Sequence, residues 1–438
     1  MTVSPYAPYP PSLWANSLTA LDLPPLQEHG LQTQVLVIGA GLSGLSTALH
    51  LARQGMQVTV LEAACVGWGA SGRNNGQVIP TLTSAEPDAI EARFGEQGEY
   101  LVQLVRDSAA QLFELIRSEQ IDCAAEQSGW FQPAHSAGRM ALSEARVRAW
   151  EKRGAPVTLL QKAECDALLG STAWHGGMLN HSGGHLNPLA LAKGLALRCL
   201  RLGVRIYQRS PATAMRFSDD QWQVKTPYGQ IRADNLVITT NAYSDFFDKP
   251  LHPPLARSIV PVRIWQLATA PLSEDIRASL LPGRQAVSDT HGDLRFFRYD
   301  QQHRLVSGGG LIFPFNSDAR LQDLVGQRLQ QAFPQLLPLR FDYVWDGHIA
   351  MTSDRMPHLH ELGPRCWTWV GCNGRGVALS VALGKELAEQ IVTPQQAPRL
   401  PCTRLRPIRF QRLGRQIAPA FLALYRWKDG REPAVASR

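Results

Sequence analysis

The chain has 438 residues, of which 44% are hydrophobic and 18% charged, a composition typical of a globular protein and not of a disordered one. This length exceeds what one compact core serves, so we expect two domains that interleave along the chain. The net charge of +7 comes from basic residues spread over the whole sequence, so we expect no nucleic-acid partner.

The seven cysteines form no CxxC pair, and such a set fits the reducing cytoplasm better than a disulfide framework or a zinc site. The first residues lack a charged start followed by an apolar stretch, so we expect no signal peptide. No run of about 18 apolar residues occurs, so no membrane span is expected. Together these features predict a cytoplasmic protein.

Residues 1–30 are rich in proline and aromatic side chains, and we expect them to form an irregular arm on the surface. Residues 34–61 predict a strand, a tight turn, a helix that stops at Gly55 and a second strand over Val58–Leu61. The first strand is a continuous apolar run, as expected of a parallel strand that is buried on both faces.

The turn between the first strand and the helix has the pattern G-x-G-x-x-G, with its glycines at Gly39, Gly41 and Gly44. The first glycine permits the turn, the second lets the backbone approach a pyrophosphate, and the third allows the helix to pack closely on the strand. Phosphates then meet free N–H groups at the positive end of the helix. The pattern therefore predicts a dinucleotide site that also includes Leu42 and Ser43.

The acidic residue that ends the second strand narrows the choice of dinucleotide. Glu62 has the spacing of a carboxylate that binds the adenosine ribose, and it would repel a 2′-phosphate, which disfavours NADP. The glycine-rich run GWGASGRNNGQ follows Glu62. FAD is longer than NAD, so a second segment of this kind is needed to cover its pyrophosphate and ribityl chain. Backbone N–H groups near Arg73 suit phosphate, and the end of the run would approach the isoalloxazine ring. The residues that we expect to contact FAD here are Glu62, Ala63, Ser71, Gly72, Arg73, Asn74, Asn75, Gly76 and Gln77.

Later segments complete the predicted fold. We expect a helix over 99–120, strands between 204 and 243, a strand-rich region over about 251–334, and strand, turn and helix again over 365–392. The predicted class is α/β (α+β), with a Rossmann-like FAD-binding domain interleaved with a mixed-sheet substrate domain. We assign 1–30 to the arm, 31–95, 181–250 and 335–395 to the FAD-binding domain, 96–180 and 251–334 to the substrate domain, and 396–438 to a basic C-terminal tail.

Six stretches in order along nearly the whole chain resemble the FAD-dependent oxidoreductases of the D-amino-acid oxidase (DAO) family, and they most resemble its γ-glutamylputrescine oxidase branch. They are VIGAGLSGLSTALHLARQG, GWGASGRNNGQ, GGHLNPLALAKGLA, ITTNAYS, GHIAMTSDRMP and GCNGRGVALSVALGKELAE. The second and fifth are the more specific. One departure is Asn75, where the branch usually has glycine. Asparagine tolerates a positive φ better than other side chains, so we expect the loop to survive.

The resemblance implies further contacts with FAD. The backbone of Ala212 would meet the adenine, with Thr240, Asn241 and Ala242 nearby. A helix N-terminus would face the flavin N1 and C2 carbonyl, where reduced flavin carries negative charge. The residues at that terminus would be Asn373, Gly374, Arg375, Gly376 and Val377. We expect FAD to be bound non-covalently, because residues 345–353, where related covalent enzymes attach the ring, include no cysteine.

The resemblance also implies a reaction, in which a hydride passes from the carbon beside an amine to flavin N5 and the resulting imine is hydrolysed. The expected substrate is an amine or N-substituted amino compound such as γ-glutamylputrescine, and no metal is expected. The catalytic residues stay open. His348 is one candidate, and Phe297, Tyr299 and Trp345 could line a substrate pocket, although core packing is the alternative for each.

A comparison with the glycine oxidases disfavours a small α-amino acid as substrate. The arginine that clamps the α-carboxylate in those enzymes falls near Ile349, a neutral residue, although Arg298 or Arg355 could substitute for it. Three alternatives remain: a D-amino-acid or glycine/sarcosine-type dehydrogenase that uses a quinone, a flavin-dependent RNA-modifying protein, and an electron-transfer protein.

The electron acceptor, O2 or a quinone, stays open as well. Some relatives use a lysine near the flavin to promote reaction with O2, and no lysine lies between Lys249 and Lys385, so we expect slow oxidase activity. The tail combines arginines with spaced apolar residues. We favour packing of these residues on the protein's own domains, and peripheral contact with an anionic membrane is the alternative. The oligomeric state is not predicted.

Overall fold

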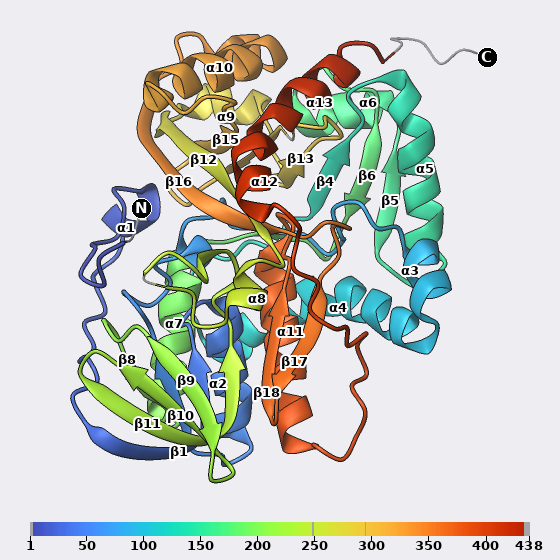
Figure 1. Ribbon diagram of the computed structural model, residues 1–438. Coiled ribbons are helices and arrows are strands. Elements are labelled where there is room, and N and C mark those ends of the chain that lie inside the picture. Colours follow the sequence, from blue (N-terminus) through green and yellow to red (C-terminus); the bar gives the residue numbers. More distant parts are fainter. Residues whose placement is uncertain (1–2, 248, 294, 433–438) are drawn as a thin grey trace.

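The computed structural model describes residues 3–247, 249–293 and 295–432, and Figure 1 shows them as two sheet-containing halves with helices around them. The α-helices are α1 (Leu13–Asn16), α2 (Leu42–Arg53), α3 (Pro87–Phe94), α4 (Glu96–Ser118), α5 (Ala137–Glu151), α6 (Lys162–Leu169), α7 (Pro188–Arg201), α8 (Pro253–Ala256), α9 (Glu274–Ser279), α10 (Ser317–Ala332), α11 (Gly376–Val392), α12 (Gln411–Ile417) and α13 (Phe421–Asp429). Short 3-10 helices are η1 (Ala70–Gly72), η2 (Asn241–Tyr243), η3 (Pro334–Leu336) and η4 (Ala418–Ala420).

The lower sheet contains the predicted nucleotide-binding unit. Its strands are β1 (His29–Ile38), β2 (Val58–Leu61), β8 (Arg205–Tyr207), β9 (Ala214–Ser218), β10 (Gln221–Thr226), β11 (Gly229–Ile238), β17 (His358–Gly363) and β18 (Cys366–Val370). The order β17-β18-β11-β1-β2-β8 places β1 between β2 and β11, and it pairs with both in parallel. Parallel neighbours need crossover connections, and α2 supplies the one between β1 and β2.

The two faces of this sheet are covered differently. Side chains of a strand alternate between faces, so Val35 and Val37 of β1 join a core with helices α2, α4, α7 and α11, whereas Leu36 and Ile38 join a core with β10. Helix α11 packs against both α2 and α4. The carboxyl ends of β1, β2 and β11 therefore lie at one edge of the sheet, which is where ligands bind in α/β folds.

The upper sheet is mixed, as predicted. Its order is β16-β12-β15-β14-β13-β4-β6-β5, and among these neighbours only β13 and β4 pair in parallel. The strands are β4 (Trp130–Pro133), β5 (Val157–Leu160), β6 (Gly177–Asn180), β12 (Val260–Pro271), β13 (Ala286–Ser288), β14 (Phe296–Tyr299), β15 (Arg304–Gly309) and β16 (Phe341–Met351). A small pair, β3 (Gln77–Val78) and β7 (Gly184–His185), completes the fold. The domain boundaries stay a prediction. The pairing adds that β16, inside the predicted FAD-binding segment, belongs to the mixed sheet.

Part of the N-terminal arm packs into the protein. The expectation that the arm lies on the surface is wrong for Leu13 and Trp14, which are buried. Trp14 Nε1 donates to the carbonyl of Asn74 at 2.9 Å, and the Tyr9 hydroxyl donates to the carbonyl of Val66 at 2.6 Å. In return, Trp68 Nε1 donates to the carbonyl of Pro8 at 2.9 Å. The arm is therefore tied to the loop that we predicted to cover FAD.

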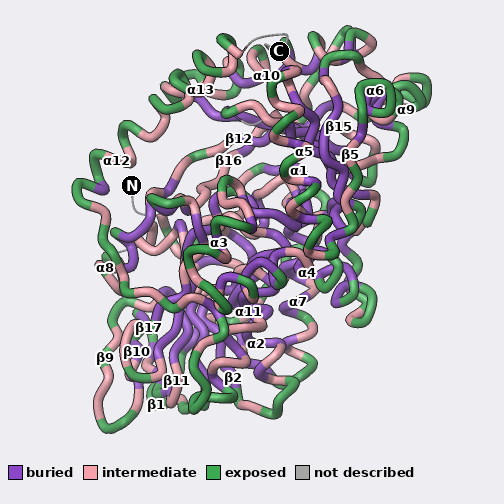
Figure 2. The backbone as a smooth tube through the Cα atoms, turned by 90° about the vertical axis from the view of Figure 1, so that its right-hand side faces the viewer, coloured by how far each residue is buried: buried purple, intermediate pink, exposed green. Residues whose placement is uncertain are grey.

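The C-terminal tail lies along the outside of the upper half as α12, η4 and α13, and Figure 2 shows it as a mostly exposed and half-exposed segment. Leu422 and Tyr425 face the body of the protein, in contact with Gly310 and Gly292. The predicted packing of the tail's apolar side chains is wrong for six of them, which are exposed: Phe410, Leu413, Ile417, Phe421, Leu424 and Trp427. Within the described ranges, no helix is both long and apolar enough to cross a membrane.

Candidate active site

One large cavity of about 1090 Å³ extends from the glycine turn after β1 to the inner side of the tail. Its wall includes Glu62 and Arg73 at one end and Arg355, Tyr425 and Asp429 at the other. Ligand pockets in proteins usually occupy about 300–1,000 Å³, so this cavity has room for a large cofactor and a second molecule.

The glycine turn is shaped by contacts that leave no room for side chains. Gly39 has φ +110°, in the region that glycine favours. A Cβ at Gly44 would lie 2.0 Å from the carbonyl oxygen of Gly39, and a Cβ at Gly41 would lie 2.8 Å from Ser71 Oγ. The backbone of Gly41 lines the cavity. Gly41 provides no side-chain cap for α2, and apart from the N–H group of Leu42, which Ser71 Oγ accepts, the first N–H groups of the helix are available to phosphate.

The carboxylate of Glu62 lies at the end of β2 and completes this end of the cavity. It accepts hydrogen bonds from the N–H groups of Ala40 at 2.8 Å and Ala64 at 2.9 Å. Burial nevertheless raises the pKa of Glu62, and the backbone donors only partly oppose this rise. Carboxylate oxygens have further lone pairs, so the group can also accept from ribose hydroxyls.

The loop over residues 67–77 closes over the start of α2. Ser71 Oγ accepts from the N–H group of Leu42 at 3.0 Å. The Arg73 guanidinium donates from Nε to the carbonyl of Trp68 at 2.6 Å and lies 4.0 Å from the ring centroid of Trp68. Trp345 Nε1 in turn donates to the carbonyl of Arg73 at 2.8 Å. These contacts hold Arg73 at the cavity wall, where its burial lowers its pKa.

The end of this loop is organised by its two asparagines. Asn74 Oδ1 accepts from the N–H group of Gly76 at 2.7 Å, and Asn75 Oδ1 accepts from that of Gln77 at 2.9 Å. The positive φ, +79°, lies at Gly76, whereas Asn75 is outside the left-handed region. Asparagine at 75 therefore costs no backbone strain. Gln77 lines the cavity, and its Oε1 is buried without a hydrogen-bond partner in the described structure.

The third turn precedes α11. The backbone at Gly374 and Gly376 lines the cavity, and the N-terminus of α11 has no side-chain cap. The Arg375 side chain is buried and donates to Thr81 Oγ1 and to the carbonyl of Leu82 at 2.6 Å. Burial lowers the pKa of Arg375 to about 9. Arg375 thus anchors the turn on its neighbouring loop, while the backbone N–H groups remain for an anionic ligand.

The structure brings most predicted cofactor residues together on this cavity. Those on its wall are Gly39, Gly41, Leu42, Ser43, Glu62, Ala63, Ser71, Arg73, Asn74, Asn75, Gln77, Ala212, Thr240, Asn241, Gly374, Arg375, Gly376 and Val377, and also Ala242 and Asn373. Gly44, Gly72 and Gly76 lie behind the wall. A Cβ at any of these three would fall within 2.3 Å of a backbone carbonyl oxygen, so they serve close packing.

Of the four substrate-site candidates, only His348 lines this cavity. Its ring lies 4.8 Å from that of Phe246, and burial lowers the pKa of His348 to about 4. The expectation for the other three is corrected because all are core residues. Phe297 packs on Phe333, with ring centroids 5.2 Å apart. The Tyr299 hydroxyl donates to the carbonyl of Leu280 at 3.0 Å, and the Trp345 indole is bonded to the Arg73 carbonyl.

Sequence reasoning missed the far end of the cavity, which the tail builds. Arg355 donates from Nη1 to Ser84 Oγ at 3.2 Å and from Nη2 to the hydroxyl of Tyr425 on α13. Asp429, one helical turn further along α13, accepts from the N–H group of Gly292 at 3.0 Å. Lys428, next to Asp429 on α13, also lines the cavity. Nothing in the local sequence of the tail signals this position.

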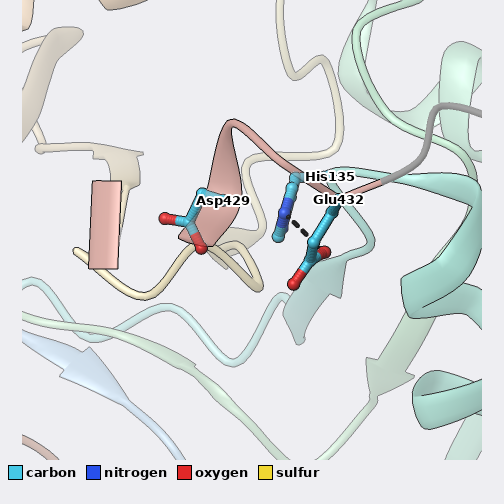
Figure 3. Close-up of side chains that lie close together, drawn as sticks. All are labelled: His135, Asp429 and Glu432. Carbon is cyan, nitrogen blue, oxygen red and sulfur yellow. Dashed lines mark ion pairs between the residues drawn. The ribbon is translucent and has the colours of Figure 1, made fainter. Parts of the chain in front are cut away.

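The end of α13 is fixed by a cluster of side chains, which Figure 3 shows. His135 Nε2 lies 3.1 Å from Glu432 Oε2, and the acceptor atoms of His135, Asp429 and Glu432 lie within 4.8 Å of one another. Glu432 also accepts from Ser136 Oγ at 3.1 Å and from Arg139 Nε at 2.8 Å. Because these donors already occupy the carboxylate, the cluster attaches the tail to the loop before α5 and gives no reason to invoke a metal.

Arg298 and Arg355, the two arginines that could bind a substrate carboxylate, differ in whether their donors are free. Arg298 is buried and donates to the carbonyls of Asn75 at 2.7 Å, Tyr299 at 2.8 Å and Leu186 at 2.8 Å. Its donors are therefore used inside the protein. Arg355 lines the cavity and has no carboxylate partner among the described residues.

A glycine turn after β1, a carboxylate at the end of β2 and helix termini without side-chain caps surround one cavity, an arrangement typical of dinucleotide-dependent oxidoreductases. The chain belongs to the DAO family, described as FAD dependent oxidoreductase, which matches residues 34–390. It is 34% identical over 363 residues to gamma-glutamylputrescine oxidoreductase of Escherichia coli (strain K12), covering 82% of this chain and 84% of the relative. The protein is an FAD-dependent enzyme that acts on amines or amino compounds, as predicted.

Solved structures confirm the fold class. L-proline dehydrogenase from P. horikoshii superposes with a TM-score of 0.73 at 19% identity, over 87% of this chain and 99% of that one. Glycine oxidase from Geobacillus kaustophilus gives a TM-score of 0.70 at 20% identity, over 84% and 96% of the two chains. At these identities the likeness extends to the fold alone.

Proposed function

We propose that this enzyme oxidises the amine end of a compound whose other end is an amino-acid group, as in γ-glutamylputrescine. The observation that carries the proposal is a pair of opposite charges at the tail-built end of the cavity. Arg355 and Asp429 line this end, and neither has an ion-pair partner within the described part of the chain. The E. coli relative named for γ-glutamylputrescine supports the same substrate class.

The two groups match a zwitterion. The guanidinium of Arg355 is held by Ser84 and Tyr425 and retains further N–H donors for a carboxylate. The carboxylate of Asp429 accepts from Gly292 and retains lone pairs for an ammonium group. Tyr425 and Asp429 are four residues apart on α13, which places them on one face of the helix. The α-carboxylate and α-ammonium of a γ-glutamyl group can bind this pair together.

The other end of the substrate would meet the wall near His348. Because burial lowers the pKa of His348 to about 4, its ring is neutral at physiological pH and adds no positive charge where an amine approaches. Tyr243 lines this wall, and its hydroxyl accepts from the backbone N–H of His348 at 3.1 Å. Its ring gives the wall an apolar surface, and the ring of Phe246 packs against that of His348.

FAD, when bound, supplies the hydride acceptor for oxidation of the C–N bond. The chain's own residues would hold it: the N–H groups of α2 and the carboxylate of Glu62 suit the adenosine diphosphate part, and the N-terminus of α11 suits the anionic edge of the ring. The imine product then reacts with water to give an aldehyde and ammonia.

Steady-state kinetics of the FAD-loaded enzyme tests the proposal. We expect kcat/KM for γ-glutamylputrescine to exceed that for putrescine, glycine and D-alanine. Arg355→Met removes a charge-assisted pair that contributes about 1.5–3 kcal/mol, so it should lower kcat/KM for γ-glutamylputrescine by roughly 10- to 100-fold. Putrescine has no carboxylate, so its turnover should change little.

The matched control is Arg232→Met, which removes an exposed arginine on β11, away from the cavity. It should behave like the wild type. Preferred turnover of glycine or D-alanine, or equal losses for γ-glutamylputrescine and putrescine in Arg355→Met, would contradict the proposal.

A further inference from the structure

The tail has an outer face that no other part of the described protein covers. This outer tail face consists of Phe410, Leu413, Ile417, Phe421, Leu424 and Trp427, all exposed, with Phe410 at 69% and Trp427 at 52%. Ile417 and Phe421 form its inner rim, because both also line the cavity. Leu413 and Ile417 are four residues apart on α12, and Phe421, Leu424 and Trp427 follow at intervals of three on α13, so the members of each helix lie on neighbouring turns. Large apolar side chains gathered in this way usually mark a site of interaction.

The charges beside the outer tail face all have one sign. The exposed charged residues between 404 and 431 are Arg404, Arg406, Arg409, Arg412, Lys428 and Arg431. None of them has an ion-pair partner among the residues that the structure describes. Two stack on members of the apolar set, with Arg409 5.0 Å from the Phe410 centroid and Arg431 4.1 Å from that of Trp427.

The inner side of the tail is anchored on the body of the protein, which leaves Phe410, Leu413, Leu424 and Trp427 outside the cavity. Gln411 Nε2 donates to the carbonyl of Ile259 at 2.9 Å, Arg415 pairs with Asp245 at 2.5 Å, and Arg426 pairs with Asp293 at 2.7 Å. The tail's carboxylates, Asp429 and Glu432, are also turned inward, to Gly292 and Arg139.

We propose that the outer tail face binds the surface of an anionic lipid membrane. Apolar side chains flanked by cations match the boundary between acyl chains and anionic headgroups. A nucleic acid would use the cations but leave the six apolar side chains in water. A second copy of the chain would bring two sets of like charges together, which opposes association. Because the same helices line the cavity, membrane contact would place the tail-built end of the cavity near the lipid surface.

Vesicle co-sedimentation of the FAD-loaded full chain tests this proposal. We expect binding to vesicles of phosphatidylglycerol and phosphatidylcholine and at least a tenfold lower partition into phosphatidylcholine alone. Leu413→Gln with Leu424→Gln, and separately Arg409→Glu with Arg412→Glu, should each reduce the partition at least fivefold. These four residues do not line the cavity, so amine oxidation should be unchanged.

Matched controls are Leu197→Gln with Leu202→Gln, exposed on and after α7, and Arg201→Glu with Arg232→Glu. Both controls should bind vesicles like the wild type, and flavin absorbance and thermal melting should show that all variants fold. The proposal is overturned by absence of binding, by equal binding to neutral vesicles, or by tail variants that bind normally. It is also overturned if the tail substitutions abolish only self-association, measured by sedimentation velocity, or only RNA binding.

Discussion

The two ends of the cavity are built by different means. The nucleotide end is made mainly of backbone from short contiguous segments, with Gly41, Glu62 and Ser71 in fixed relation to α2. The tail-built end is made of side chains from distant segments, with Arg355 and Tyr425 brought together across 70 residues of sequence. A site made from local backbone tolerates little change in residue size, whereas a site made from assembled side chains is sensitive to charge and identity.

The largest effect is expected from adding one carbon atom to the nucleotide end. Gly44→Ala would place Cβ 2.0 Å from the carbonyl oxygen of Gly39, so the turn or the start of α2 must shift. Such overpacking costs about 1–3 kcal/mol, so we expect FAD affinity, measured by fluorescence titration of the apoprotein, to fall roughly 5- to 150-fold. Gly138→Ala, where only Ser136 Oγ lies within 4 Å, is the control. Normal FAD affinity in Gly44→Ala would break the comparison.

The next largest effect on FAD affinity is expected from removal of the Glu62 carboxylate at the nucleotide end. Glu62→Ala should weaken FAD binding by about 1–3 kcal/mol, because charge-assisted hydrogen bonds to the ribose are lost. The visible spectrum of the bound flavin should stay the same, since the carboxylate lies at the adenosine end. Isothermal titration and absorbance spectra check both statements, with Glu114→Ala on the exposed side of α4 as control. An unchanged dissociation constant would refute the assignment.

A smaller effect is expected at the tail-built end. Asp429→Asn keeps an oxygen for the Gly292 N–H group but removes the charge that would meet an α-ammonium. We expect kcat/KM for γ-glutamylputrescine to fall about tenfold, which corresponds to about 1.4 kcal/mol. Glutarylputrescine lacks the α-ammonium and should change by less than about twofold. Similar losses for both compounds would indicate that Asp429 only attaches the tail.

The smallest effect is a pH dependence of stability. The folded-state pKa of His348, about 4, lies below its ordinary value of 6.5, so the unfolded chain takes up a proton first as the pH falls. This residue therefore destabilises the fold increasingly between pH 6.5 and about 4. His348→Gln should lose about 1 kcal/mol less stability than the wild type between pH 7.5 and 5, after allowance for its partial exposure to the cavity. Denaturant unfolding at both pH values measures this, with surface His29→Gln as control. Parallel losses in His348→Gln and wild type would contradict it.

The features that could be predicted from the sequence are those set by interactions between residues close together in the chain. The second strand, Val58–Leu61, has the expected bounds, and the helix before it ends at Arg53, because apolar periodicity and Gly55 act over a few residues. The strand-rich region over about 251–334 was predicted from its own sequence. For Phe297, Tyr299 and Trp345 the choice between a substrate pocket and core packing stayed open, because the sequence of a strand does not show which of its faces meets a site.

The N-terminal arm and the tail could not be placed from sequence, because both depend on partners far along the chain. Trp14 lies 60 residues from the loop carbonyl that accepts its N–H. Tyr425 and Asp429 occur in a segment whose spacing indicates an amphipathic helix without saying which side chains turn inward. Six exposed apolar residues in the tail therefore contradicted the packing that we favoured.

Hydrogen bonds between the N-terminal arm and the loop over residues 66–74 couple the positions of these two segments. Tyr9 and Trp14 donate hydrogen bonds to the carbonyls of Val66 and Asn74, and Trp68 donates one to the carbonyl of Pro8. A segment that stabilises residues 66–74 therefore also stabilises residues 8–14, and by reciprocity we expect a chain trimmed through Trp14 to bind FAD less tightly.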